Sequence, residues 1–161
     1  MLKADGEMPL GYDKFLELCR GAVSESKYNE LKELTLLKGS GALFSEWLKF
    51  YGTFHSELTY QRNVRLGRTA TPPADRSEEM TKLISSAMNN KNPLVAEETL
   101  LAFQFEKLDE LVGSHYFDDH ALTGYALKLR LLERKTSFDA ERGREEFDRI
   151  TGKLEQEIIN M

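Results

Sequence analysis

Residues 92–113 read NPLVAEETLLAFQFEKLDELVG and combine a long apolar pattern with clear helix boundaries. Asn92 followed by Pro93 is typical of a helix start, because proline fits the first helical position, where its missing N–H is no loss. Gly113 is typical of a helix end. Between these signals, apolar residues recur every three or four positions over a wide face. We therefore expect a helix that is buried on more than one side and lies at the centre of the core.

The residues that follow predict two further helices. Asp118 is a good N-cap for a helix whose apolar spacing continues to Leu132. Cations near a helix C-terminus are favoured by the dipole, and four of them lie near the expected end of this helix, at Lys128, Arg130, Arg134 and Lys135. A last helix is expected to begin near Ser137 or Asp139. Its apolar seam consists of Phe147, Ile150, Leu154 and Ile158.

Upstream of residue 92, the same spacing predicts four more helices. The first has Asp13 as its expected cap and forms a hairpin with a second that begins near Ser26. The third, which contains Trp47, is the longest, and a fourth follows a loop over about residues 67–76. The pair Pro72-Pro73 cannot occupy a helix interior, so we expect this loop to be mobile. The fold class is all-α, an irregular bundle of about seven helices arranged as helical hairpins, with no substantial sheet, in one domain over residues 1–161.

The composition limits the classes of function. A formal net charge of -5 opposes general affinity for nucleic acid, which relies on clustered Lys and Arg. The single cysteine, Cys19, cannot form an internal disulfide, which favours a reducing compartment. Residues 1–7 contain no apolar signal segment, and no apolar run approaches the roughly 18 residues needed to cross a bilayer. We expect a cytoplasmic protein without direct membrane insertion.

A basic strip at the end of the longest expected helix is the candidate binding site. Arg62, Asn63, Arg65 and Arg68 lie there, and arginines at steps of three drift only slowly around a helix. Guanidinium groups bind carboxylates and phosphates through paired hydrogen bonds. We therefore expect the strip to bind an acidic patch on another protein, although the same residues could form a solvated helix end.

A second cluster offers an alternative function. His115, Asp118, Asp119 and His120 gather imidazoles and carboxylates that could hold a divalent metal in a small metal-dependent hydrolase. The histidines lack the i, i+4 helical spacing, however, and Asp118 and Asp119 are explained as a cap and a first-turn acid. We therefore expect no enzyme, no catalytic residues, no metal and no cofactor.

Three segments carry a family resemblance: LLAFQFEKLDELVGSHYFD at 100–118, YALKLRLLER at 125–134 and YDKFLELC at 12–19. They resemble a bacterial family of unknown function that is encoded beside subunits of V-type (V/A-type) ATP synthases. The resemblance implies a non-catalytic accessory or stalk-type subunit of this ion-transporting rotary ATPase. Such a subunit would lie on the cytoplasmic side, peripheral to the inner membrane, in the place of the helical central-stalk subunit.

The leading hypothesis is therefore a protein that contacts V-type ATPase subunits through Arg62, Arg65 and Arg68 and through exposed helix faces. The metal-dependent hydrolase is the alternative, and a regulator that binds nucleic acid through the same basic strip is the third reading. The sequence leaves open which subunit is contacted and whether the chain forms homo-oligomers.

Overall fold

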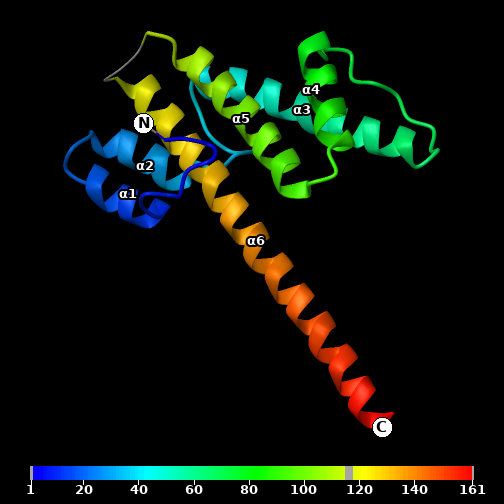
Figure 1. Cartoon of the computed structure of the whole chain (residues 1–161). Helices are drawn as coiled ribbons and strands as arrows, with labels where there is room; N and C mark the ends of the chain where they lie inside the picture. The colour runs from blue at the N-terminus through cyan, green and yellow to red at the C-terminus, as the bar shows by residue number, and fades with distance from the viewer. Residues whose placement is uncertain (1, 115–117, 161) are drawn as a thin grey trace.

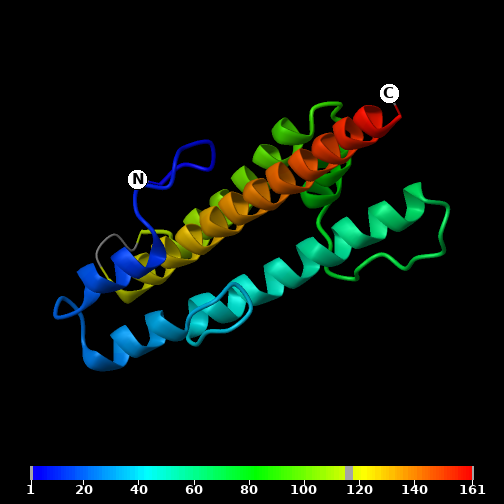
Figure 2. The same ribbon diagram turned by 90° about the horizontal axis from the view of Figure 1, so that it is seen from below.

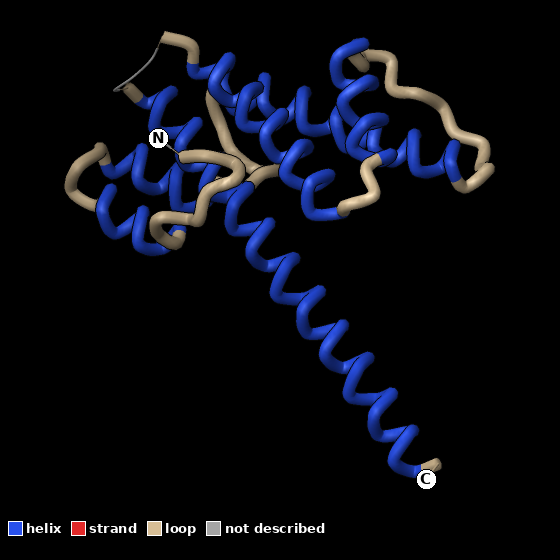
Figure 3. Tube along the Cα trace, viewed as in Figure 1, coloured by secondary structure: helices blue, strands red, loops and turns tan. Residues whose placement is uncertain are grey.

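The computed structural model describes residues 2–114 and 118–160, and for residues 137–142 it describes only the backbone. Within that part of the chain, helices are joined by loops and no strand is present, which confirms the all-α prediction (Figure 3). The helices are α1 (Tyr12–Cys19), α2 (Glu25–Glu33), α3 (Ala42–Arg65), α4 (Glu78–Asn89), α5 (Pro93–Val112) and α6 (Asp119–Ile159).

The helices pack into a body from which the C-terminal part of α6 projects (Figure 1). We call residues 2–114 and 118–136 the body, and residues 143–159 the distal segment. Helix α5 contacts α3, α4 and α6, as expected for a central helix, and the first part of α6 contacts α1, α2, α3 and α5. Seen from below, the α1–α2 hairpin lies at one end of the body and the loop between α3 and α4 at the other (Figure 2).

The expected boundaries of the central helix are confirmed. The Asn92 side chain accepts a hydrogen bond from the backbone N–H of Leu94 at 3.1 Å, and Pro93 opens α5. Gly113 ends the helix with a φ of 57°, a conformation that costs a residue without a Cβ little. Asp118 caps α6 by accepting two backbone N–H bonds of its first turn. The first helix differs, because its cap is Gly11 and Asp13 lies in the first turn.

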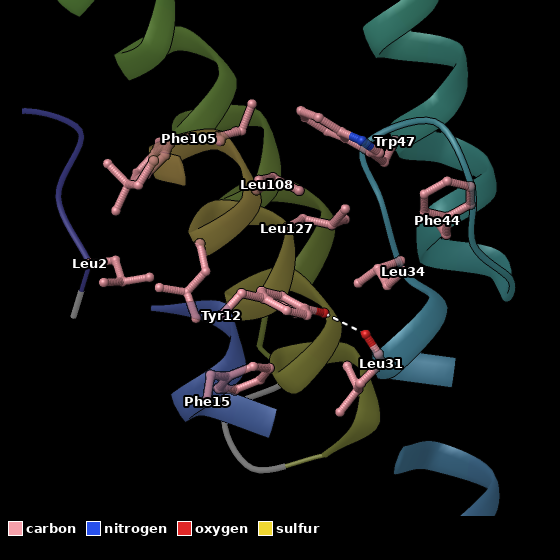
Figure 4. Packing of buried hydrophobic residues seen from close by; sticks show 14 of the residues in the cluster. Leu2, Tyr12, Phe15, Leu31, Leu34, Phe44, Trp47, Phe105, Leu108 and Leu127 are labelled. Carbon is pink, nitrogen blue, oxygen red and sulfur yellow. Dashed lines mark hydrogen bonds between the residues drawn. The ribbon is translucent and has the colours of Figure 1, made fainter. Parts of the chain in front are cut away.

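The core consists of two apolar clusters. The larger cluster joins α1, α2, the start of α3, α5 and the first part of α6 around fully buried residues such as Trp47, Leu108 and Leu127 (Figure 4). The smaller cluster joins α3, α4 and α5 around Ile84. Phe50 packs against both clusters. The body is therefore held together by apolar contacts that run from α1 to α4.

The expected boundary between the last two helices is wrong. Helix α6 runs without a break from Asp119 to Ile159, so neither Ser137 nor Asp139 begins a new helix. The cations assigned to a helix end lie in mid-helix, where each has a partner in the body. The Arg130 guanidinium lies 3.4 Å from the centre of the Tyr12 ring and donates to the Leu34 carbonyl oxygen at 2.9 Å.

The other cations also make tertiary contacts. Lys128 forms an ion pair with Asp109 of α5, and Arg134 donates a hydrogen bond to the Tyr51 hydroxyl of α3. Lys135 lies near Glu98 of α5, with 4.0 Å between Nζ and Oε1. These contacts fix the rotation of α6 about its own axis relative to its neighbours. They, rather than an interaction with a helix dipole, explain the positions of the four cations.

The Tyr12→Phe substitution should lower the free energy of unfolding by about 1 kcal/mol. The buried Tyr12 hydroxyl donates to the Leu31 carbonyl oxygen at 2.7 Å, and its loss would leave that oxygen with only the longer bond from the Leu34 N–H, at 3.3 Å. Urea unfolding followed by the fluorescence of Trp47, the single tryptophan, measures the change. Tyr125→Phe is the control, because the Tyr125 hydroxyl makes no hydrogen bond with the described residues; equal losses for both variants would refute the assignment.

Candidate protein-interaction surfaces

The residues of the basic strip expected at the end of α3 have different surroundings in the structure. The Arg65 guanidinium donates to the Met88 carbonyl oxygen at 3.0 Å and also binds the Asn89 side chain, so it closes the C-terminal end of α4. Asn63 lines a shallow hollow together with residues 69–71 of the following loop. Arg68 is exposed. The four residues therefore do not form one continuous surface.

Arg62 turns instead towards a recess between α3, α5 and α6. Its side chain has neither a hydrogen bond nor an ion pair within the described part of the chain. We call this hollow of about 200 Å³ the basic recess. Its lining comes from three helices: Phe54, His55, Leu58 and Arg62 of α3, Glu97, Leu100, Leu101 and Gln104 of α5, and Leu131, Arg134 and Lys135 of α6.

The α3 side of the basic recess has a positive field. His55 lies beside Arg134, with 3.5 Å between Nη1 and Nε2. Burial, together with the charges of Arg134 and Arg62, lowers the pKa of His55 from 6.5 to about 4. The charges of two guanidinium groups thus both disfavour the protonated form of the His55 imidazole. Such a place favours an anionic group, whose charge would offset both arginines.

The floor of the basic recess contains a buried polar group. Gln104 is 7% exposed, and its Nε2 donates to the Leu100 carbonyl oxygen at 3.1 Å. Its Oε1 is buried and accepts no hydrogen bond in the described structure. Glu97 also lines the recess and is itself engaged in an interaction. The recess therefore combines apolar walls with a positive side, which suits an acidic side chain carried on a partly apolar surface.

The stability of the body should fall as the pH drops from 6.5 towards 4. His55 binds a proton near pH 6.5 in the unfolded chain but only near pH 4 in the folded chain, so the unfolded state binds more protons in this window. Thermal unfolding at stepped pH values measures the effect. His55→Gln should flatten the profile between pH 4 and 6.5, whereas an unchanged profile in this variant would contradict the assigned cause.

A larger open groove of about 1160 Å³ adjoins the basic recess at the base of the distal segment. His55 and Arg134 line both hollows. Leu36 and Leu37, from the segment between α2 and α3, line the groove as well, and Leu37 is 70% exposed. The positive side of the recess is thus continuous with an apolar surface.

The distal segment exposes the apolar seam expected in the sequence. Phe147 and Ile158 are each 68% exposed, and Ile150 and Leu154 are about half exposed. The segment extends away from the other helices of the body (Figure 1). The expectation of an amphipathic helix is therefore met, but its apolar face has no partner among the described residues.

The alternative metal site gains no support from the described residues. His115 lies outside them, Asp118 caps α6, and Asp119 occupies its first turn. His120 follows in the same turn and is engaged in an interaction. Among the side chains of residues 2–114, 118–136 and 143–160, no three His, Cys, Asp or Glu are placed to hold a metal ion.

His55 and Arg134 were not predicted from the sequence as residues of a binding site. Tyr51 and His55 are four residues apart in α3, and their rings lie edge to face with centres 4.3 Å apart. A polar ring pair at helical spacing, followed by Arg62 two turns later, is a signal that could have indicated the positive side of the recess. Arg134 could not be found in this way, because it is 79 residues from His55.

Comparison with known proteins identifies a family. No described helix combines the length and apolar composition needed to cross a bilayer. A search of curated proteins and a search of solved structures gave no match. A family model described as "Protein of unknown function (DUF2764)" matches residues 73–158, which are more than half of the chain. The matched region contains α4, α5 and almost all of α6. The chain therefore belongs to the DUF2764 family.

Proposed function

We propose that the chain is a non-catalytic accessory or stalk-type subunit of a V-type (V/A-type) ATP synthase that docks through its basic recess onto an acidic surface of another subunit. The observation that carries the proposal is that Arg62 and Arg134 line one recess together with His55, beside an open apolar groove. Charge complementarity of this kind steers association and selects the partner. Such a subunit would act at the cytoplasmic side of the inner membrane, peripheral to it.

The choice of assembly rests on the resemblance of residues 100–118 and 125–134 to the ATPase-associated family. These residues lie within the region matched by the family model. They also supply two walls of the basic recess, through α5 and α6. The segments on which the resemblance depends thus contribute two of the three walls of the proposed docking site, and α3 contributes the third.

Reversing the exposed charge of Arg62 should abolish most of the binding. In Arg62→Glu, a repulsive carboxylate at the basic recess faces the acidic partner, and we expect retention of ATPase subunits to fall at least about tenfold. The measurement is a pull-down from native membranes that contain the intact ATPase. Arg65 is left unchanged because it closes the end of α4.

Lys49→Glu is the matched control, since Lys49 is an exposed cation of the same helix, outside the recess. The proposal would be wrong if both variants retained ATPase subunits as the wild type does. The nucleic-acid reading is tested with the same proteins. It requires oligonucleotide binding that weakens steeply as salt rises, whereas our proposal expects no such binding.

A further inference from the structure

The distal segment of α6 presents an apolar surface that needs a partner. Its four seam residues span three turns and lie on one face, because steps of three and four keep side chains aligned on a helix. A solitary helix of this length is marginally stable in water, and most helical stability comes from packing of the apolar face. Soluble monomers rarely expose continuous apolar patches of this kind.

We propose that the distal segments of two copies of this chain pack against each other as an antiparallel helix pair, with the two-fold axis near Ile150. The inference does not depend on the proposed ATPase contact. It uses a different surface, because residues 143–159 line neither the basic recess nor the adjoining groove.

Charge complementarity across the seam favours a second copy. At 100° per residue, Glu146 and Lys153 lie on one flank of the seam, and Arg144 and Glu155 lie on the other. In the antiparallel pair, residue 146 of one copy lies opposite 153 of the other, and 144 lies opposite 155. Both flanks then join opposite charges, and the two-fold axis repeats each contact. The same segment is therefore complementary to itself.

A parallel pair lacks this complementarity. In register, it would bring Glu146 close to Thr151 of the second copy and Lys153 close to Ile158, so neither charged side chain would meet an opposite charge. It would also place the two broad bodies beside each other at the same end of the pair. The body lies at one end of the distal segment (Figure 1), so the antiparallel arrangement puts the two bodies at opposite ends.

The projecting length of α6 fits the antiparallel arrangement. With the axis near Ile150, Asn160 of one copy lies opposite residue 140 of the other. Thr136, which lines the groove at the base of the distal segment, is the last residue that we assign to the body. In this register, residues 137–139 keep Asn160 about one turn away from the other body. Ile158 lies close to Gly143 of the second copy, where the absence of a side chain leaves space.

Sedimentation equilibrium of the purified chain tests the pairing. We expect twice the 18.5 kDa mass of one chain at high micromolar concentration. Ile150→Asp places two carboxylates at the axis and should weaken dimerisation on the order of 100-fold or more. Gln156→Asp introduces the same carboxylate on the opposite face of the segment and should leave the dimer intact. A wild-type chain that remains at 18.5 kDa, or a dimer that survives Ile150→Asp, overturns the proposal.

A charge exchange tests the orientation. Arg144→Glu should weaken the dimer about fivefold to tenfold, because the introduced carboxylate would then face Glu155 of the second copy; Glu146 is left unchanged because it pairs with Arg149 of its own helix. The double variant Arg144→Glu/Glu155→Arg restores opposite charges only in the antiparallel pair and should recover the wild-type dissociation constant. Failure of the double variant to recover it would overturn the antiparallel orientation.

Discussion

Leu129→Ala is expected to lower the free energy of unfolding of the body by about 2–5 kcal/mol. Leu129 has no exposed surface and lies in the part of α6 that packs against the larger apolar cluster. Removing its side chain leaves a cavity among close-packed neighbours, which relax only partly. Urea unfolding followed by Trp47 fluorescence measures the loss, because Trp47 lies in the same cluster.

Leu154→Ala in the distal segment provides the matched control. It is the same substitution in the same helix, but Leu154 is 54% exposed and lies outside both apolar clusters. We expect its effect on the unfolding of the body to stay within about 0.5 kcal/mol when measured at low protein concentration. Equal losses for the two variants would show that the distal segment folds as part of the body, contrary to our description.

Arg76→Met is expected to cost about 1–3 kcal/mol, because it leaves the buried carboxylate of Glu57 without its cation. Glu57 has no exposed surface, and the Arg76 Nη1 lies 3.4 Å from its Oε1. Gln61 donates to the same oxygen at 2.8 Å. We place the cost below that of a fully buried ion pair, since the Arg76 side chain is 35% exposed. Urea unfolding measures it.

A double-mutant cycle separates the charge effect from lost packing. Arg76 also lies over the Tyr60 ring, with 5.3 Å between the guanidinium carbon and the ring centre, and Arg76→Met alters this contact as well. In a Glu57→Gln background no charge is stranded, so Arg76→Met should cost clearly less. The same cost in both backgrounds would mean that Arg76 acts by packing alone. The ion pair would also hold the end of the loop over residues 67–76 against α3.

The sequence predicted the boundaries of α5 because they depend on local chemistry. Asn92, Pro93 and Gly113 act through their own backbone and side-chain atoms, so their effect does not depend on tertiary contacts. The junction inside α6 was predicted wrongly for a related reason. Ser137 and Asp139 favour helix starts, but nothing between Arg134 and Ser137 ends a helix, and α6 continues through them.

The candidate site was predictable only in part. Arg62 was identified from its spacing on α3, and the structure places it in the basic recess. Arg65 belongs to the same spacing pattern but binds the end of α4, which depends on how α4 packs. Arg134 joins His55 only because α6 lies against α3. Contacts between distant segments leave no periodic signal in the sequence, so Arg134 could be assigned to the recess only from the structure.

Photocrosslinking from position 100 in native membranes is the most direct test of the proposed docking site. A photoreactive side chain that replaces Leu100 would lie at the basic recess and leave both arginines in place, and one that replaces Lys49 serves as the control outside the recess. We expect the first to give a covalent adduct with a V-type ATPase subunit and the second to give none. Adducts from position 100 that contain no ATPase subunit, in membranes whose ATPase is intact, would show that the basic recess binds a different protein.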